Sequence, residues 1–471
     1  MRYLISVPFS LYFNAQSGMS VTIACADNLR FRSAGQFELK NDNKQDRLRK
    51  SAGVGVRYMV FKSDSSDGVV LLPLNRWVDA EWGSESYWSI NICRALQNEG
   101  IRHIAVCGEL DPVARNILTD SCEQLIELGS GKRMNIPGDL SFYYRLWRTG
   151  RILAHKNMLI HHVFPMGFSN GFNPLALTKL SNLLIIGPLL YMPSSENTMI
   201  SKEFENKRPH VTGQSINRPN ILYSNKLLHY LHQKTLMSSS HLIFDSEDTR
   251  NQFIELVPEL KSKKYTIIAT GGVDRNVFKP DVTKNKSPNI ITIGTVGYLG
   301  PEKHIDTVIR AMGLLKDANL KFVVAGEGSM KASLEKLVSD LDLIGKIDFI
   351  GRINHSNVGD FHRQIDAFIQ LAPAPFEVRA SVQEALMSGL PIIVSASPKR
   401  IQKAKCLPYG FLVDAVDETT VAEALIQIIS NPSFLQSQSE KAREFALEHY
   451  SVESVGKRLH RVYTNVTSDF S

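Results

Sequence analysis

The stretch IITIGTVGYLGPEKHIDTVIRAMGLLKDANLKFVVAGEG, residues 290–328, decides the fold. It opens with the apolar run IITIGTVGYL, continues with HIDTVIRAMGLLKD at helical spacing, and ends in a second apolar run, LKFVVAG. Short connections join the three segments. A strand, a helix and a second strand in this order predict a βαβ unit, in which a helix covers two parallel strands.

Strand-like and helical segments also alternate along most of the remaining chain. After residue 328, the helical segment MKASLEKLVSDLDL is followed by the apolar runs KIDFIG, AFIQLA, PIIVS and GFLV. Before residue 280, the apolar runs are VVLLPL, HIAVCG, NMLIHHVF, NLLIIGP, SHLIFDS and YTIIAT. This alternation predicts α/β architecture with two doubly wound, Rossmann-like domains in tandem. Because such sheets bind ligands beyond the carboxyl ends of their strands, we expect the site in the cleft between the two sheets.

The expected domain boundaries follow from changes in this pattern. Residues 1–68 are polar, with the charged run LKNDNKQDRLRK and no sustained period, which predicts a poorly ordered N-terminal extension. Met59 could serve as an alternative start, and a signal peptide is not expected because the first residues lack a convincing cleavage site. The N-terminal domain is expected over residues 69–280 and the C-terminal domain over 285–448, with 279–288 as a linker.

Composition and charge limit the functional classes. The chain has 471 residues, of which 43% are hydrophobic and 21% charged, as in globular proteins of two or three domains. The net charge of +7 suits an anionic sugar-phosphate ligand or an acidic membrane surface. No nucleic-acid-binding signature accompanies this charge, so nucleic acid is not an expected partner.

The cysteines give no sign of a metal site or of disulfides. Cys25, Cys93, Cys107, Cys122 and Cys406 are scattered, odd in number and without metal-binding spacing. We therefore expect buried free thiols in a reducing compartment and no metal. No apolar run reaches the length of a transmembrane helix.

Two glycine-containing loops could approach an anionic ligand. Gly83, in the loop WGSE, would expose the free N–H groups of the helix that follows, although simple capping by Ser84 explains the loop equally well. Gly326 and Gly328 follow the strand LKFVVA, where a Gly-x-Gly turn allows close backbone approach. A bare turn is the alternative, and the incomplete dinucleotide fingerprint argues against NAD.

A third loop, VGYLGPEKHID, brings a cation near the end of a strand. Gly297 ends the strand and Lys303 lies near the start of the next helix. A lysine is unfavourable at a helix N-terminus, so its position there suggests a diphosphate ligand, with an exposed surface lysine as the alternative.

The fourth loop, FEVRASVQEALMSG, carries two acids. The pattern predicts a helix from Ala380, with Glu384 about one turn inside it and Glu377 in the preceding loop. Carboxylates can accept hydrogen bonds from sugar hydroxyls while the helix start holds phosphate oxygens. Two solvated acids near a helix start are the alternative explanation.

Taken in order, these segments resemble the retaining glycosyltransferase family four, which has the two-domain GT-B fold. VGYLGPEKHIDTVIRAM is similar to the family's VGRL-x3-KG segment, VVAGEG to its V-x-G-x-G turn, and AFIQLAPAPFEVRASVQEALMSGLPIIVS to its acidic motif and following strand. WGSE resembles the Gly-Gly-x-Glu loop, and SHLIFDSEDTRNQF and TGGVDRNVF resemble the segments that enter the interdomain crossing. The resemblance spans roughly residues 69–465.

The resemblance implies transfer of a sugar from a nucleotide-diphosphate sugar with retained anomeric configuration. It implies that Glu384 holds the ribose hydroxyls, Lys303 the diphosphate, and Glu377 the donor sugar. It further implies that Ala380 and Ser381 offer backbone N–H groups to phosphate. No cofactor is expected, and transfer is expected to be metal-independent because no DxD-type carboxylate pair stands at a suitable position.

Further roles follow from the same resemblance. Gly83 would let the N-terminal domain close over the diphosphate, and His162 or His161 corresponds to a family histidine near the transferred sugar, with His162 slightly favoured. The loops at Gly297, Gly326 and Gly328 would contact the donor. The final helix, about residues 451–466, would return to the N-terminal domain.

Three departures from the family pattern stand out. Tyr298 replaces an arginine that precedes the lysine. The two acids are separated by six residues rather than seven, and Val378-Arg379-Ala380 stands where a Gly-Phe-Gly stretch is usual. Arg379 is a candidate to replace the lost cation at the phosphate. Gly271 replaces an asparagine.

The expected function is therefore an enzyme of surface polysaccharide or glycolipid biosynthesis that acts on a glycan, lipid-linked or small-molecule acceptor. The rival is a non-catalytic GT-B-like subunit that binds glycan or a partner protein; a nucleotide-sugar epimerase is a third alternative. A cytoplasmic location is expected. Contact with the inner face of the membrane is left open for the basic segment 144–156, which is otherwise an exposed helix.

Overall fold

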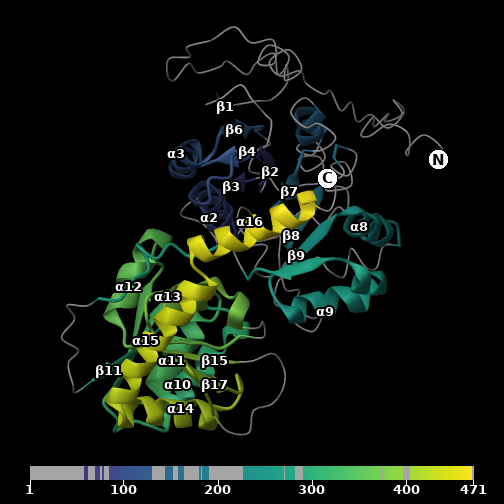
Figure 1. Cartoon of the computed structure of the whole chain (residues 1–471). Helices are drawn as coiled ribbons and strands as arrows, with labels where there is room; N and C mark the ends of the chain where they lie inside the picture. The colour runs from purple at the N-terminus through teal and green to yellow at the C-terminus, as the bar shows by residue number, and fades with distance from the viewer. Residues whose placement is uncertain are drawn as a thin grey trace, which may run out of the picture.

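A computed structural model describes residues 58–61, 69–74, 77–78, 84–129, 144–151, 158–163, 180–181, 183–189, 226–269, 271–281, 290–372, 376–395 and 404–468. The chain forms two α/β bodies, purple to teal and green to yellow in Figure 1. Each is built on a mostly parallel sheet, so the predicted fold class is confirmed. The proposed linker falls largely outside the described residues.

The N-terminal sheet has the order β1-β6-β4-β2-β7-β8-β9-β10 among the described strands. These strands are β1 Tyr58–Phe61, β2 Val70–Pro73, β4 His103–Cys107, β6 Gln124–Glu127, β7 Ile160–His162, β8 Leu184–Leu189, β9 His241–Phe244 and β10 Tyr265–Ile267. All neighbours pair in parallel except β1 with β6. A small pair, β3 Trp77–Val78 and β5 Glu109–Leu110, lies beside this sheet.

Helices cover this sheet and alternate with its strands. They are α2 Ser84–Asn98, α3 Pro112–Ser121, α8 Lys226–Ser238, α9 Glu247–Leu256 and the 3-10 helix η3 Pro258–Ser262. Residues 144–151 are also helical, with Leu146 buried and the Arg145 guanidinium donating to the Leu128 carbonyl at 2.8 Å. Asp111 and Ser246 cap α3 and α9 by accepting hydrogen bonds from first-turn N–H groups, as expected of short polar side chains there.

The C-terminal sheet has the order β13-β12-β11-β14-β15-β17-β16, with only β16 antiparallel among these strands. The strands are β11 Ile291–Val296, β12 Leu320–Ala325, β13 Ile347–Gly351, β14 Ala367–Gln370, β15 Ile392–Ser395, β16 Lys405–Leu407 and β17 Gly410–Val413. The helices are η4 Pro301–Lys303, α10 Ile305–Gly313, α11 Lys331–Asp340, η5 His355–Asn357, α12 Val358–Gln364, η6 Phe376–Val378, α13 Ala380–Met387, α14 Glu418–Ser430 and α15 Pro432–His449.

Both sheets have a topological switch point. In the N-terminal sheet, β4 and β6 lie on one side of β2 and β7 to β10 on the other. In the C-terminal sheet, β12 and β13 lie on one side of β11 and β14 and the later strands on the other. A crevice opens where successive crossovers leave in opposite directions, so the carboxyl ends of β2 and β7, and of β11 and β14, are the expected ligand positions.

The last helix, α16 Val452–Ser468, leaves the C-terminal body and lies along the N-terminal one, as Figure 1 shows in yellow. Its apolar face belongs to the core that α2 and the N-terminal sheet share, with Val455, Leu459 and Val462 buried there. At its far end, the Tyr463 hydroxyl lies 2.6 Å from Nδ1 of His161 on β7. Burial of this stripe fixes α16 on the N-terminal domain.

The segment Gly271–Val273 passes between α2 and the start of α16. The Asn91 side chain donates to the Gly272 carbonyl at 2.8 Å, and Val273 exchanges backbone hydrogen bonds with the chain on either side of Ser451. A Cβ atom on Gly271 would lie 2.2 Å from the Trp88 carbonyl oxygen. A side chain at position 271 would therefore clash with the α2 backbone, which accounts for the glycine there.

Two further expectations can be compared with the structure. Among the described residues, the first strand of the N-terminal sheet is β1, which pairs with β6 and lies inside the region expected to be a poorly ordered extension. Residues 1–57 and 62–68 lie outside the described residues. Within the part of the chain that the structure describes, no helix has both the length and the apolar character needed to cross a membrane.

Candidate functional site

A pocket lies at the switch point of the C-terminal sheet. It is bordered by the carboxyl ends of β11 and β14 and by the loop that leads into α10. The polar groups in its wall are Thr295, Tyr298, Lys303 and Gln370, and the backbone of Gly297 completes the rim. The position agrees with the general rule for ligands in doubly wound sheets.

The glycines around this pocket serve different purposes. Gly297 has a φ of +146°, and a Cβ atom there would meet nothing within 4 Å, so its backbone faces open space. A Cβ on Gly326 would lie 1.8 Å from the Gly297 carbonyl oxygen, and one on Gly328 would lie 2.3 Å from that of Leu299. The Gly-x-Gly turn therefore lets the β12–α11 loop pack against the pocket loop, and the open backbone belongs to Gly297.

Lys303 stands in the wall of this pocket. It ends η4, and His304 follows it with a φ of +46° in the left-handed region, an uncommon conformation for a side chain of this size. Burial lowers the pKa of the Lys303 ammonium, while the charge of Glu302 partly offsets this effect. A partly desolvated cation is poised to gain from the arrival of an anion.

The first turn of α13 faces the same region. Arg379 stands at its N-cap position and offers no side-chain hydrogen bond to the helix. The N–H groups of Ala380 and Ser381 make no hydrogen bond to any described residue, whereas those of Val382 and Gln383 bond to the Arg379 carbonyl. The Ser381 hydroxyl donates to Oε1 of Gln370, a residue of the pocket wall, at 3.0 Å, so the helix start and the pocket are adjacent.

Glu384 lies one turn further along α13 and is 5% exposed. Its Oε1 accepts a hydrogen bond from Nε2 of His355 at 2.7 Å. The Tyr87 ring of α2 lies against the His355 ring, with 4.4 Å between their centroids. The carboxylate is thus held at the meeting of the two domains, with its second oxygen left for a ligand.

The structure does not support a phosphate-binding role for Arg379. Its guanidinium is buried and donates to the carbonyl oxygens of Gln370, Ala372 and Ser395 at 2.8, 2.5 and 2.9 Å. Gln370 and Ser395 end β14 and β15, and Ala372 lies just after β14. Arg379 therefore fastens the loop before α13 to the sheet.

Glu377 is half-buried in η6. Burial raises the pKa of its carboxyl group, the Arg379 charge lowers it, and the charge of Asp248 on α9 of the other domain raises it. The Gln383 side-chain amide donates to the Glu377 backbone carbonyl and fixes the turn. A carboxyl group facing the N-terminal domain is well placed for a ligand bound between the domains.

Both candidate histidines lie at the switch point of the N-terminal sheet, and both are buried. The Nε2–H of His161 donates to the Gly187 carbonyl at 2.9 Å, and its Nδ1 accepts from the Tyr463 hydroxyl, so His161 fastens α16 to the sheet. Burial lowers the pKa of His161 to about 4 and that of His162 to about 3, so both rings are neutral at pH 7. Both ring nitrogens of His161 are engaged within the fold, so we keep His162 as the preferred candidate, and a catalytic role for either histidine stays a prediction.

The structure places Gly297 and Lys303 in the pocket wall and the start of α13 next to it, with Glu384 one turn further along that helix, whereas the histidines lie on the other domain. Gly83 lies outside the described residues, directly before α2. Sequence reasoning missed Gln370, His355 and Tyr87. The segment around His355, GRINHSN, carries no motif, and its contact with Glu384 depends on folding across 29 residues.

Comparison with known proteins agrees with this geometry. The family model of glycosyl transferases group 1 matches residues 274–445, which include the whole pocket. Among curated proteins, the chain is 27% identical over 252 residues to the phosphatidylinositol N-acetylglucosaminyltransferase gpi3 subunit of Schizosaccharomyces pombe, covering 53% of each chain. It is 23% identical over 205 residues to N-acetyl-alpha-D-glucosaminyl L-malate synthase of Bacillus anthracis, covering 42% of this chain. The match spans about half the length of these relatives.

Two solved structures share the fold. Sucrose-phosphate synthase of Thermosynechococcus elongatus superposes with a TM-score of 0.62 at 16% identity, covering 85% of this chain and 99% of its own. Alr3699/HepE of Anabaena, solved in complex with UDP, gives a TM-score of 0.59 at 14% identity, covering 84% and 99%. At this identity the likeness establishes the two-domain arrangement alone.

Proposed function

We propose that this chain, whose residues 274–445 match the family model of glycosyl transferases group 1, transfers a sugar from a nucleotide-diphosphate sugar to an acceptor with retention of configuration. One arrangement supports the proposal: Lys303 lines a pocket at the switch point of the C-terminal sheet, the start of α13 adjoins that pocket through Ser381 and Gln370, and Glu384 lies one turn along the same helix. These are the groups needed to hold a diphosphate and a ribose.

The nucleotide binds through two kinds of contact. The Glu384 carboxylate accepts hydrogen bonds from ribose hydroxyls, and its contact with His355 keeps it oriented. The N–H groups of Ala380 and Ser381 and the Lys303 ammonium meet the phosphate oxygens, as the positive end of a helix and a desolvated cation favour.

The same groups assist the bond-breaking step. As the bond between the anomeric carbon and the diphosphate oxygen breaks, negative charge grows on the leaving diphosphate. Donors fixed before the reaction stabilise this charge more in the transition state than in the ground state. The acceptor hydroxyl attacks from the face that the diphosphate leaves, and its proton passes to the departing diphosphate oxygen, so configuration is retained without an enzyme nucleophile.

The N-terminal domain supplies the acceptor side. His162 lies at its switch point and is neutral, so it can approach the sugar without adding charge near the forming cationic centre. The charges of Asp248 and Arg379 both act on the Glu377 carboxyl group, Asp248 raising its pKa and Arg379 lowering it. We expect this carboxyl group to contact sugar hydroxyls. An acceptor of the glycan or lipid-linked class fits the proposal.

We further propose a UDP-linked N-acetylhexosamine as the donor to test first. Support comes from relatives: the two curated proteins described above are named for N-acetylglucosaminyl chemistry, and HepE was solved with UDP. This choice also fits the open backbone at Gly297, which leaves room beside the diphosphate.

The experiment is a donor panel with the purified full chain. UDP-, GDP- and ADP-sugars are incubated with and without lipid or glycan extracts, and release of the nucleoside diphosphate is followed. Turnover that Glu384→Ala abolishes and Glu335→Ala preserves supports the proposal, because Glu335 is an exposed acid on α11. Donor binding without turnover on every acceptor favours the non-catalytic subunit instead.

A further inference from the structure

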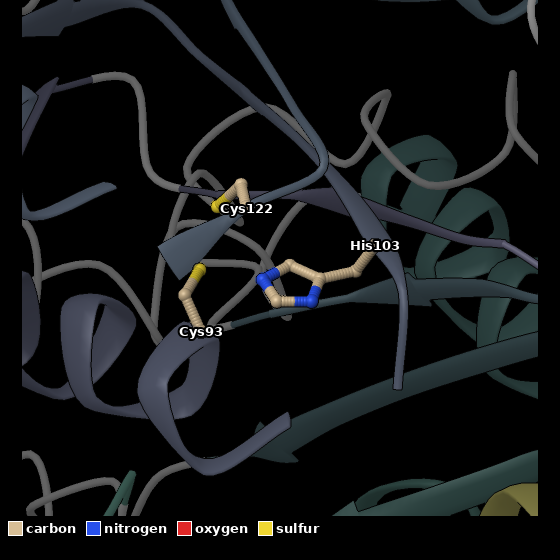
Figure 2. Close-up of side chains that lie close together, drawn as sticks. All are labelled: Cys93, His103 and Cys122. Atoms are coloured by element: carbon tan, nitrogen blue, oxygen red, sulfur yellow. The ribbon is translucent and has the colours of Figure 1, made fainter. Parts of the chain in front are cut away.

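Three potential metal ligands meet inside the N-terminal domain, as Figure 2 shows. Cys93 comes from the middle of α2, His103 is the first residue of β4, and Cys122 follows α3. One ligand atom from each lies within 4.8 Å of the other two. The three residues are 0%, 1% and 2% exposed, so the cluster is sealed from solvent.

A hydrogen bond fixes the tautomer and the orientation of the His103 ring, as is usual for histidines that bind metals. Its Nδ1 lies 2.9 Å from the Ile101 carbonyl oxygen. A carbonyl can only accept, so Nδ1 carries the proton and the Nε2 lone pair is directed elsewhere. Figure 2 shows the other ring nitrogen facing the two sulfur atoms. A backbone carbonyl that fixes the tautomer in this way is typical of the outer shell of a metal site.

We propose that Cys93, His103 and Cys122 bind one thiophilic closed-shell cation, Zn²⁺ or Cu⁺. Two thiolates and an imidazole are the ligands that these ions prefer over oxygen-seeking cations such as Mg²⁺ or Ca²⁺. On binding, each thiol releases its proton to solvent and the sulfur takes up the cation. Zn²⁺ balances the two thiolate charges and takes a fourth ligand in most structural sites, whereas Cu⁺ accepts three ligands readily.

The location separates this site from the proposed sugar transfer. His103 begins β4, so the cluster lies at the amino ends of the strands, whereas ligands of doubly wound sheets bind at the carboxyl ends. The cation would tie α2 and α3 to the sheet. Because α2 carries Tyr87, which contacts His355 on the other domain, the site would also hold the domain interface in place.

No local pattern in the sequence indicates this cluster. The spacing from Cys93 to His103 and on to Cys122 matches no zinc motif, and the expectation of no metal was drawn from the scattered cysteines and the lack of a DxD-type carboxylate pair. The three ligands come from three elements that the sheet topology brings together, which short-range motifs do not report.

The test is the metal content of the full chain. Protein is produced in medium with added Zn²⁺ or Cu⁺, passed over a desalting column, and analysed by elemental mass spectrometry. We expect about one ion per chain in the wild type and background levels in Cys93→Ser, His103→Gln and Cys122→Ser. Cys107→Ser is the matched control, because this thiol is equally buried on β4 but lies outside the cluster.

A spectroscopic measurement on the wild type avoids dependence on variants that fold poorly. X-ray absorption at the metal edge should report sulfur and nitrogen neighbours in a ratio near two to one. The proposal would be overturned if the wild-type protein held only background levels of metal after it was produced, and again after it was refolded, in the presence of either ion. So would a bound ion that survives both cysteine substitutions, or a Cys93–Cys122 disulfide found by mass spectrometry.

Discussion

Nε2 of His355 lies 2.7 Å from Oε1 of Glu384, and this contact fixes the carboxylate on which the proposed ribose site depends. The Tyr87 ring packs against the same histidine from the N-terminal domain. Burial raises the pKa of the Tyr87 hydroxyl to about 12, so the ring remains neutral beside Glu384. One domain thus supports the orientation of a binding group on the other.

His355→Ala should weaken nucleoside diphosphate binding about ten-fold. The substitution leaves a nearly buried carboxylate without an orienting donor, and a charged hydrogen bond contributes about 1.5–3 kcal/mol. Titration calorimetry measures the effect, and His355→Gln, which retains an N–H donor, should lose less. Tighter binding in His355→Ala would mean that the histidine competes with the ribose instead of orienting its acceptor.

Arg379 and Lys303 should differ in what they support. Arg379→Ala removes the donor to three buried carbonyls and should lower the free energy of unfolding by about 3 kcal/mol or more, with little change in nucleotide affinity per folded molecule.

Lys303→Ala should weaken UDP binding about ten-fold and leave uridine binding unchanged, because uridine lacks the diphosphate. Chemical denaturation and calorimetry measure the two quantities. An unchanged stability in Arg379→Ala would refute its structural role.

Two glycines of the pocket should respond in opposite ways. Gly326→Ala places a Cβ 1.8 Å from a backbone oxygen and should destabilise the C-terminal domain by about 2–4 kcal/mol. In Gly297→Ala the new Cβ atom would lie in open space, and the positive φ would cost only about 1–2 kcal/mol of stability. The main effect of this substitution should therefore be on donor affinity. Thermal unfolding of both variants checks the order. Equal losses of stability would contradict the packing described for the Gly-x-Gly turn.

Stability should fall as the pH falls from about 6.5 to 4. Burial lowers the pKa of His161 to about 4 and of His162 and His362 to about 3, while unfolded histidines titrate near 6.5. Between these pH values the histidines bind protons in the unfolded chain but not in the folded chain. Each of them therefore lowers the free energy of unfolding by about 1.4 kcal/mol for each pH unit that the pH falls. Denaturation at a series of pH values measures it, and His161→Gln should reduce the slope by about that amount. A slope that His161→Gln leaves intact would contradict the assignment.

The sequence predicted the two sheets because their strands are apolar on both faces and alternate with helices. It did not predict that β1 joins the first sheet, since YMVF is a short run within a polar region and its partner, β6, is remote in the sequence. The switch points could not be located, because strand order depends on which crossovers leave to each side.

The candidate site was predicted only in part. The pocket loop, the start of α13 and Glu384 follow local patterns that the sequence displays. The direction of a long side chain cannot be predicted from such patterns: Arg379 points into the sheet rather than to the pocket. The partner of Glu384 cannot be predicted either, because His355 reaches it from another strand-to-helix connection.

The central claim is that the pocket of the C-terminal domain binds a nucleoside diphosphate through Glu384. Calorimetric titration of the wild type and Glu384→Gln with UDP, and with uridine to isolate the ribose contact, tests it most directly. We expect Glu384→Gln to weaken both ligands by about the same factor, roughly ten- to hundred-fold. Unchanged affinity of the variant for both ligands would contradict the account.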